Sequence, residues 1–530
     1  MTKISAEPYT LSTKSNTLGI ENASASASRK MDPGNAIELD DTQQKICHDI
    51  LSENFFVGCV VGGAGTGKTF VVKRVVQFAK KKGMNFIILA PTGRAAANTN
   101  TGMTIARFLN SRNFIKKANQ ARGEPWAEKC ISELAPASKW AIDISPGSQG
   151  IVIIDEGFMM TLRTWVQVTN AFSCCTTKGG IKFVIVGDYN QLPPVGGKPF
   201  YTDPRFLKWG QKGQLQFFEL QRSYRCGGDP VLETLLNGFK NDENKSSVDA
   251  IIDDLIWKSM QVKLKTPKLI ITQRNKTVND INRMKSDRAA TGKRFVLLHL
   301  GSNPNEKPFK YSQGEPIVIT QNEYGLVPSE APFDKDEGIF EQVYRQDLVK
   351  INGQFGTITN IVATVEDDGT PSPIEGDMQA FDVALDTGVT VTIFMYKKKG
   401  KFFADVCHGY ASTLYKVQGL GFDVGQRIEF DTCGMSSREV MTAFSRVRCI
   451  DDLYLDYKRR DGDIHGRVQP IEKDANLEAF LQLMRGEYIF PSRKRAVDAS
   501  DVPSRFGVPR KKRQVPALRT SVFGAGNLKL

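Results

Sequence analysis

Two kinds of apolar pattern alternate along the first two-fifths of the chain. Short runs rich in β-branched residues have the length and composition of buried strands. They lie at residues 57–61, 85–90, 151–154 and 181–186. Between them, apolar residues recur at helical spacing, most clearly over residues 70–79. Strands that alternate with helices predict a parallel sheet covered by helices, with functional residues at the carboxyl ends of the strands.

The same alternation returns twice in the second half. A buried strand is predicted at residues 269–272, and a helix that contains Val278 and Ile281 follows it. From 303 to 404 the pattern changes to short strand-like runs separated by Gly, Pro and Asp, which predicts an all-β insertion. The α/β pattern resumes at about 405, so the insertion divides a second α/β unit.

Length and composition fit a globular protein that works inside the cell. A chain of 530 residues predicts three or four domains. No apolar stretch approaches the roughly 18 residues that a membrane helix needs, so no membrane association is expected. The nine cysteines and four histidines are dispersed, without the spacing of a zinc site or a disulfide framework. A reducing intracellular compartment is therefore expected.

The net charge of +13 is concentrated at the C-terminal end. Residues 491–530 hold ten Lys or Arg and two Asp, whereas residues 37–490 carry a net charge of only +4. The cluster Arg510–Arg513 is compatible with a nuclear address, with an extra nucleic-acid contact, or with a merely solvated end. Global charge therefore says little about the folded part, where a binding groove has to be argued from motifs.

The strongest motif is a phosphate-binding loop between the first strand and the first long helix. Its glycines would let backbone N–H groups converge on phosphate oxygens at a helix N-terminus. Lys68 would reach the β- and γ-phosphates, and the Thr69 hydroxyl would ligate Mg²⁺. The loop residues are Gly62, Gly63, Ala64, Gly65, Thr66, Gly67, Lys68 and Thr69.

Two further strands deliver polar residues to the same edge of the predicted sheet. Asp155 and Glu156 follow the strand at 151–154. Asp155 would hold the Mg²⁺ shell, and Glu156 would polarise the attacking water. Gln191 lies in the loop after the strand at 181–186, where it could touch the γ-phosphate or the water.

Three more segments complete an ordered set: Gln221–Arg225, Tyr410–Gly419 and Thr442–Arg448. Together with the loop and the two strand ends, they resemble superfamily 1 helicases. Ala90–Ala96 and the 187–196 loop are similar to the RecD/Dda-like branch, which moves 5′ to 3′ on DNA. Asn352–Thr357 is similar to the signature inside that branch's SH3-like insertion. The resemblance spans about residues 39–455.

This resemblance implies an α/β fold of two RecA-like P-loop lobes with ATP between them. Lobe 1 would hold a small insertion, and lobe 2 an SH3-like all-β insertion. The implied organisation is a disordered segment at 1–36, lobe 1 at 37–205 with a wedge-type insertion at 107–148, lobe 2 at 206–302 and 405–490, the β insertion at 303–404, and a disordered basic tail at 491–530.

The resemblance also assigns roles to residues. Arg225 and Arg446 would be arginine fingers from the second lobe that stabilise transition-state charge when the lobes close. Gln43 would recognise adenine, Tyr224 would stack on it, and Gly419 would approach the γ-phosphate.

Three residues are expected to contact the nucleic acid. Thr92 and Thr413 match positions that bind backbone phosphates, one in each lobe, without reading sequence. Phe108 is a candidate for base stacking, together with Trp126 and Trp140 of the wedge insertion, although packing in the core explains each aromatic residue as well.

The sequence therefore predicts an ATP- and Mg²⁺-dependent helicase or translocase on single-stranded DNA, in replication, repair or recombination. An RNA helicase of the viral superfamily 1 type remains an alternative, because ribose recognition depends on groove details. A nucleic-acid remodeller that opens no duplex is a second alternative. A protein loading partner is compatible with either, and the oligomeric state stays open.

Overall fold

The computed structural model describes most of the chain between Leu39 and Ile489. The described ranges are 39–99, 102–110, 148–173, 180–224, 229–241, 244–261, 267–293, 295–300, 307–328, 344–362, 380–398, 400–456, 464 and 467–489. The predicted disordered end segments and most of the wedge insertion, with Trp126 and Trp140, lie outside them. Within these ranges, no helix is long and apolar enough to cross a membrane.

The first lobe is built on a six-stranded sheet in the order β3-β2-β4-β5-β1-β6. All of its neighbouring pairs are parallel, and β1 lies between β5 and β6, with Val60 opposite Val186 and Phe218. Its strands are β1 (Val57–Gly62), β2 (Asn85–Ala90), β3 (Met103–Thr104), β4 (Gly150–Ile154), β5 (Ile181–Gly187) and β6 (Leu215–Leu220). The predicted parallel sheet is therefore present.

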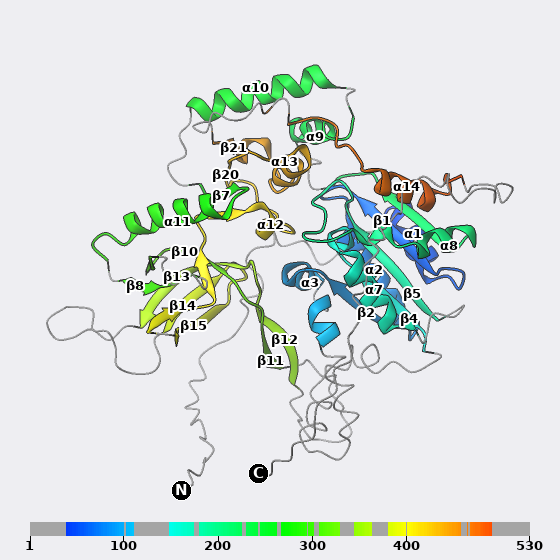
Figure 1. The fold of residues 1–530 in the computed structure, drawn as a ribbon, viewed down its shortest axis with the longest axis horizontal. Coiled ribbons are helices and arrows are strands. Elements are labelled where there is room, and N and C mark those ends of the chain that lie inside the picture. The colour runs from blue at the N-terminus through cyan, green and yellow to red at the C-terminus, as the bar shows by residue number, and fades with distance from the viewer. Residues whose placement is uncertain are drawn as a thin grey trace, which may run out of the picture. The chain divides into compact units, whose positions relative to one another are not determined.

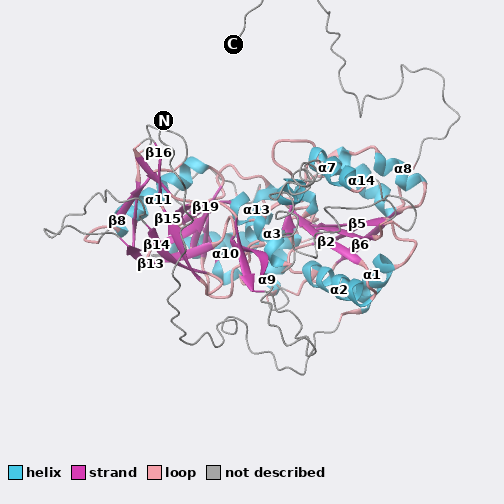
Figure 2. Ribbon diagram, turned by 90° about the horizontal axis from the view of Figure 1, so that it is seen from below, coloured by secondary structure: helices cyan, strands magenta, loops and turns pink. Residues whose placement is uncertain are grey.

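Helices cover both faces of this sheet (Figures 1 and 2). On one face, α1 (Asp41–Leu51) and α2 (Lys68–Lys81) bury apolar residues against the strands. On the other face lie α7 (Leu162–Ala171), α8 (Arg205–Gln211) and α14 (Ala475–Arg485). The lobe also contains α3 (Gly93–Asn98) and two short 3₁₀ turns at Gly157–Met159 and Phe200–Thr202.

Two of the predicted domain boundaries are wrong. We expected lobe 1 to end at 205, but β6 pairs in parallel with β1 and extends the first sheet to Leu220. We also expected 405–490 to belong entirely to the second lobe. The Phe480 ring of α14 instead packs 5.0 Å from Phe206 and 5.7 Å from Phe200, measured between ring centroids. An amphipathic helix buries its apolar face wherever a matching face exists, and its sequence position does not say which.

The second lobe contains a four-stranded parallel sheet in the order β19-β7-β20-β21. Its strands are β7 (Leu269–Thr272), β19 (Ala411–Thr413), β20 (Ile428–Phe430) and β21 (Leu453–Leu455). Its helices are α9 (Pro230–Asn237), α10 (Lys245–Gln261), α11 (Asn275–Ala289), α12 (Leu414–Val417) and α13 (Ser437–Phe444). A 3₁₀ turn lies at Ile450–Asp452. Apolar residues of both strands and helices form the main core cluster here, and Ile270, Val278 and Ala411 form a smaller one.

The β insertion enters the second lobe between α11 and β19. It was predicted at 303–404, but its strands run from Phe295 to His408, because β8 pairs with β9 and β18 pairs with β10. Its main sheet has the order β15-β14-β13-β10-β18. Its strands are β8 (Phe295–Leu298), β9 (Phe309–Ser312), β10 (Pro316–Ile319), β11 (Glu323–Pro328), β12 (Tyr344–Lys350), β13 (Phe355–Val362), β14 (Ala380–Leu385), β15 (Thr390–Phe394), β16 (Tyr396–Lys398), β17 (Lys401–Phe403) and β18 (Val406–His408). It has its own apolar core around Tyr311 and Phe381.

Candidate functional site: a cavity at the phosphate-binding loop

The predicted phosphate-binding loop joins β1 to α2, and glycine is needed at two of its positions. Gly67 has φ +86°, a left-handed conformation that favours glycine, and a Cβ there would lie 2.8 Å from Gln43 Nε2. A Cβ on Gly62 would lie 2.8 Å from the carbonyl oxygen of Leu220. No side chain caps the N-terminus of α2, so its backbone N–H groups face the loop. The loop is therefore shaped for an anion at a helix N-terminus.

A cavity of about 370 Å³ opens at this loop and gathers residues from both lobes. Its lining residues are Ala64, Gly65, Thr66, Gly67, Lys68, Thr69, Phe70, Asn98, Asp155, Glu156, Gln191, Tyr224, Gly419, Arg446 and Arg448. We call it the P-loop cavity. Lys68 Nζ donates hydrogen bonds of 2.8 Å to the carbonyl oxygens of Gly62 and Gly63, so its charge lies within the loop. The fold thus assembles residues that are separated by nearly 400 positions in the sequence.

The two carboxylates at the end of β4 have different environments. Asp155 is buried, and burial together with the Glu156 charge raises its pKa to about 7. Glu156 has φ +51°, the only positive φ of a non-glycine residue in the described part of the chain. The left-handed conformation costs roughly 1–2 kcal/mol. Such strain at a cavity wall is typical of a functional position.

Asp155 and Thr69 fit the chemistry of a Mg²⁺ site. They supply a carboxylate and a hydroxyl, which are hard oxygen ligands, and both line the P-loop cavity. The raised pKa of Asp155 reflects a buried negative charge without enough nearby positive charge to balance it. No group of three or more His, Cys, Asp or Glu side chains close enough to hold a metal occurs in the described ranges. A magnesium ion that keeps several waters needs only one or two protein ligands.

A chain of hydrogen bonds links the two lobes at the floor of the cavity. Asp188 accepts a bond from Gln191 Nε2 (3.0 Å), and Gln191 Oε1 accepts one from the Arg446 guanidinium (3.5 Å). Arg446 is 3% exposed. It also donates to the carbonyl oxygens of Thr442 (2.8 Å) and Leu420 (3.0 Å). These bonds fix a second-lobe arginine beside the first-lobe residue that was predicted to touch the γ-phosphate.

The predicted base-recognition residues also meet at the loop. Gln43 is the third residue of α1 and forms a capping box with Asp40, the N-cap residue of that helix. Asp40 also accepts a hydrogen bond from the Tyr224 hydroxyl, and this bond is the main cause of the lowered pKa of Asp40. Tyr224 N donates to the carbonyl oxygen of Gly65 (2.8 Å). An exposed ring that lines the cavity and a buried amide beside Gly67 are thus held at the loop.

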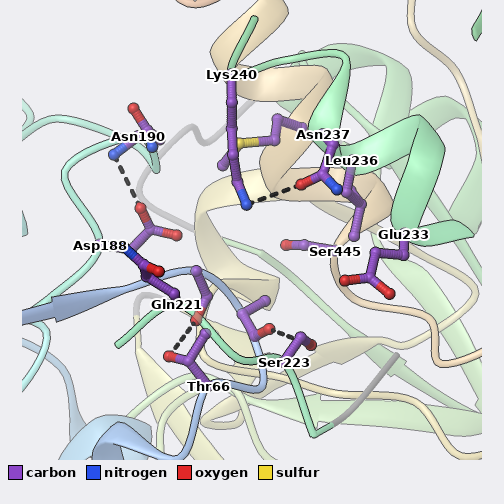
Figure 3. A pocket seen from close by; sticks show the side chains of 13 residues that line it. Thr66, Asp188, Asn190, Gln221, Ser223, Glu233, Leu236, Asn237, Lys240 and Ser445 are labelled. Atoms are coloured by element: carbon purple, nitrogen blue, oxygen red, sulfur yellow. Dashed lines mark hydrogen bonds between the residues drawn. The ribbon is translucent and has the colours of Figure 1, made fainter. Parts of the chain in front are cut away.

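A second, smaller cavity of about 160 Å³ also borders the loop (Figure 3). It shares Ala64 and Thr66 with the first cavity. Lys240, just beyond α9, bonds to Asn237 here (2.9 Å). Ser445, which accepts a bond from Arg446 (2.7 Å), is also part of the lining. Second-lobe residues therefore line both cavities that border the phosphate-binding loop.

Sequence reasoning missed three residues of the P-loop cavity, one of which is Phe70, directly after Thr69. Arg448 lines it and forms an ion pair with Asp423 (3.3 Å). Its position two residues after Arg446 in the same segment was the only available signal. Asn98 comes from the last turn of α3, and nothing in the sequence points to it. Arg225, the other predicted arginine finger, lies outside the described residues.

The two predicted phosphate-contacting threonines occupy equivalent places in the two lobes. Thr92 follows β2 and caps α3, where its side chain accepts a hydrogen bond from Ala95 N (3.2 Å). Thr413 ends β19 and is the cap residue of α12. Beside Thr92, the Arg94 guanidinium donates to the carbonyl oxygen of Gly353 in the β insertion (3.1 Å). Through that bond, the segment Asn352–Thr357, which resembles the signature of the SH3-like insertion, contacts the first lobe.

Phe108 requires a correction. Its side chain is fully buried and stacks on Phe172, with ring centroids 5.5 Å apart and planes at 6°. A ring in this environment cannot stack on a base unless the core opens. The residue is part of the first lobe's core, so the prediction that it stacks on a base is wrong.

Comparisons with known proteins agree with this geometry. Residues 38–253 match the AAA domain family. An uncharacterised protein of Methanocaldococcus jannaschii is 33% identical over 162 residues, which are 29% of this chain and only 13% of that protein's length.

Solved structures of Pif1 helicases resemble most of the chain. The Bacteroides protein, in complex with ADP-AlF3 and single-stranded DNA, is similar over 85% of this chain and 98% of its own, with a TM-score of 0.54 and 18% identity. The protein from Candida albicans is similar over 84% and 100%, with a TM-score of 0.54 and 17% identity. At this identity the likeness shows a common fold. It confirms the fold predicted from the resemblance to superfamily 1 helicases of the RecD/Dda-like branch.

Proposed function

We propose that the chain is a nucleic-acid-dependent ATPase, a DNA helicase that moves 5′ to 3′ on single-stranded DNA in replication, repair or recombination. The observation that carries the proposal is the bond from Arg446 of the second lobe to Gln191 of the first, at the floor of the P-loop cavity. A cavity whose charged lining comes from two lobes can couple the state of its ligand to the distance between them. The strained backbone of Glu156 at the cavity wall is also typical of a functional position.

The first-lobe loop would bind the triphosphate of ATP. Backbone N–H groups at the start of α2 would hold the phosphates, and Lys68 would exchange its two carbonyl partners for phosphate oxygens. Tyr224 and Gln43 would hold the adenine. A Mg²⁺ ion held by Thr69 and Asp155 would neutralise charge on the β- and γ-phosphates.

Glu156 and Gln191 would orient and polarise the water that attacks the γ-phosphorus. The left-handed backbone at Glu156 fixes the direction of its side chain relative to the end of β4. Gln191 is held between Asp188 and Arg446, so its amide cannot rotate without breaking one of the two bonds. Positioning of this kind is the main contribution that a protein makes to phosphoryl transfer.

Arg446 would stabilise the charge that develops on the γ-phosphate oxygens. Its guanidinium is held by backbone carbonyls of the second lobe, so its position depends on how closely that lobe approaches. Hydrolysis would therefore be fast only when the lobes are closed. Thr92 and Thr413, one in each lobe, would grip strand phosphates alternately as the lobes close and open.

Two observations support single-stranded DNA as the ligand. The Bacteroides relative was solved with single-stranded DNA, and the predicted motif set is that of DNA motors. The direction of movement is carried over from the branch. RNA is the alternative ligand, and an ATPase assay with each nucleic acid distinguishes it from DNA.

The test is steady-state ATPase activity without nucleic acid, with single-stranded DNA, and with single-stranded RNA of the same sequence. We expect strong stimulation by DNA, and loss of turnover by about 10³-fold or more in Lys68→Ala. Unwinding of 5′- and 3′-tailed duplexes then tests direction. Stimulation by RNA alone would replace the DNA assignment, and full activity in Lys68→Ala would refute the site.

A further inference from the structure

One face of the β insertion combines exposed rings with lysines. Hairpin β8–β9 and hairpin β16–β17 are joined by a backbone hydrogen bond from His299 N to the carbonyl oxygen of Phe402 (2.9 Å). Figure 2 shows β8 and β16 at the same end of the insertion. The strands follow one another as β9, β8, β17 and β16, and we call their solvent side the hairpin face.

The alternation of side chains separates this face from the core. Val296 and Leu298 of β8 are buried in the insertion's apolar cluster, and Phe402 packs against that cluster. Phe295 and Leu297 therefore point the other way and are 37% and 47% exposed. Apolar side chains at alternate strand positions normally face a core, so their exposure here needs an explanation.

The rings on the hairpin face are held in place. Tyr396 is 48% exposed and stacks on Phe403, its cross-strand partner, with centroids 5.8 Å apart and planes at 19°. The Phe403 ring lies 5.9 Å from that of His299. A ring that is already ordered loses little conformational entropy when it stacks on a ligand.

The charge of these strands is of one sign. Their sequences, Phe-Val-Leu-Leu, Phe-Lys-Tyr-Ser, Tyr-Lys-Lys and Lys-Phe-Phe, contain no acidic residue and four lysines. Three of these, Lys310, Lys398 and Lys401, lie on the hairpin face, whereas Lys397 pairs with Phe402 on the other side. Lys398 and Lys401 face each other across β16 and β17. Lys310 lies over the Phe295 ring at 5.3 Å and pairs with Asp287 at the edge of the face. The body of the chain has almost no excess charge, so this local excess is distinctive.

We propose that the hairpin face is a second binding site for single-stranded nucleic acid, outside the track between the lobes. Lysines would contact phosphates, and Tyr396 and Phe295 would stack on bases, which is the combination that binds single strands without sequence preference. Four strands about 4.8 Å apart span roughly 14 Å, and other four-stranded platforms with exposed aromatics hold two or three bases. The identity of the ligand rests on the proposed function, whereas the existence of the site does not.

The test uses the full chain with labelled oligo(dT) of about 8 and about 30 nucleotides, which are respectively within and beyond the usual reach of one binding groove. We expect Lys398→Glu with Lys401→Glu to weaken binding of the long strand about 10-fold. The salt dependence of log K should become shallower by about 1.4, the value for two lost single-strand phosphate contacts. Binding of the short strand and the maximal ATPase rate should not change.

Two further variants separate stacking from charge. Tyr396→Ala should weaken binding of the long strand about 5-fold, within the range for one lost stacking contact, whereas Tyr396→Phe keeps the ring and should bind as the wild type. The matched control is Lys208→Glu with Lys212→Glu, which makes the same charge change on exposed residues of the first lobe. Thermal melting checks that every variant is folded.

Each outcome decides something. Unchanged binding of the long strand in the lysine variant, or an equal loss in the control, overturns the proposal. The single-strand assignment is overturned if the lysine variant loses affinity for duplex DNA only. It is also overturned if poly-glutamate displaces the labelled strand as effectively as unlabelled oligo(dT) does. If no strand stimulates wild-type ATPase but the lysine variant still loses strand binding, the proposed function fails and the hairpin face stands. If DNA stimulates the wild-type ATPase and the lysine variant binds the long strand as the wild type does, only the proposal for the hairpin face is wrong.

Discussion

The two lobes contribute to the P-loop cavity in different ways. The first lobe supplies a backbone loop, a helix N-terminus and the ends of two parallel strands, all fixed by the fully buried strands β1, β4 and β5. The second lobe supplies a glycine and two arginines. The proposed phosphate-binding groups would therefore come from one lobe, and the proposed arginine finger, Arg446, from the other. Separating the lobes should remove catalysis and leave most nucleotide affinity.

Loss of the second-lobe arginine should have the largest effect. Arg446→Ala is expected to lower kcat by about 10³-fold or more, because the charge on the transferred phosphoryl group loses its partner. Affinity for a fluorescent ADP should change only a few-fold. The matched control is Arg448→Ala, a half-exposed residue in a surface ion pair, which should cost less than about 10-fold. Equal losses in the two variants would contradict this division of labour.

The packing of α14 on the first lobe gives the second prediction. Phe480 is buried against Phe200 and Phe206, so Phe480→Ala should destabilise the protein by about 3–5 kcal/mol. Thermal unfolding followed by tryptophan fluorescence reports this directly, because Trp165 stacks on Phe206 in the same cluster. Trp257→Ala on the exposed side of α10 is the control and should cost less than about 0.5 kcal/mol. A small effect of Phe480→Ala would mean that α14 is not part of the first lobe's core.

The buried carboxylate gives a prediction with a defined pH window. The pKa of Asp155 is raised from 3.8 to about 7, so the folded state binds its proton more tightly than the unfolded state. Stability from this residue is present below about pH 4 and is lost as the pH rises to 7.

In metal-free buffer, Asp155→Asn should therefore melt like the wild type near pH 4. Above pH 7 the variant should be more stable by on the order of 2 kcal/mol. Added Mg²⁺ should stabilise the wild type and not the variant. A difference in melting that is the same at all pH values would contradict the raised pKa.

The smallest effect concerns the base-recognition end of the cavity. Tyr224→Ala should weaken ADP binding about 5- to 10-fold, because a stacking ring contributes on the order of 1 kcal/mol. Tyr224→Phe keeps the ring and loses only the bond to Asp40, so it should stay within about 3-fold of the wild type. Isothermal titration measures both. If the Phe variant loses as much as the Ala variant, the hydroxyl matters and the ring does not stack.

The first lobe could be predicted from the sequence because its signals are local. The phosphate-binding loop, the carboxylates after β4 and the loop that contains Gln191 each lie directly at the end of an apolar run. A parallel sheet then places them at one edge without further information. Residues 62–69, 155, 156 and 191 consequently meet where they were expected.

The contributions that were missed depend on contacts between distant segments. Asn98 reaches the cavity only because α3 ends there, and α14 joins the first lobe only because its apolar face matches an aromatic cluster. Phe108 is the opposite case, a predicted site residue that belongs to the core. The sequence alone does not show whether an aromatic side chain is buried or exposed. The stacking partner of Phe108, Phe172, lies 64 residues away.

The return of α14 to the first lobe constrains how the protein can move. The chain leaves the first sheet after β6 and comes back between β21 and α14, so two covalent connections join the lobes. Two connections limit how far the lobes can separate, so we expect their opening to be more restricted than in a protein whose lobes share a single connection.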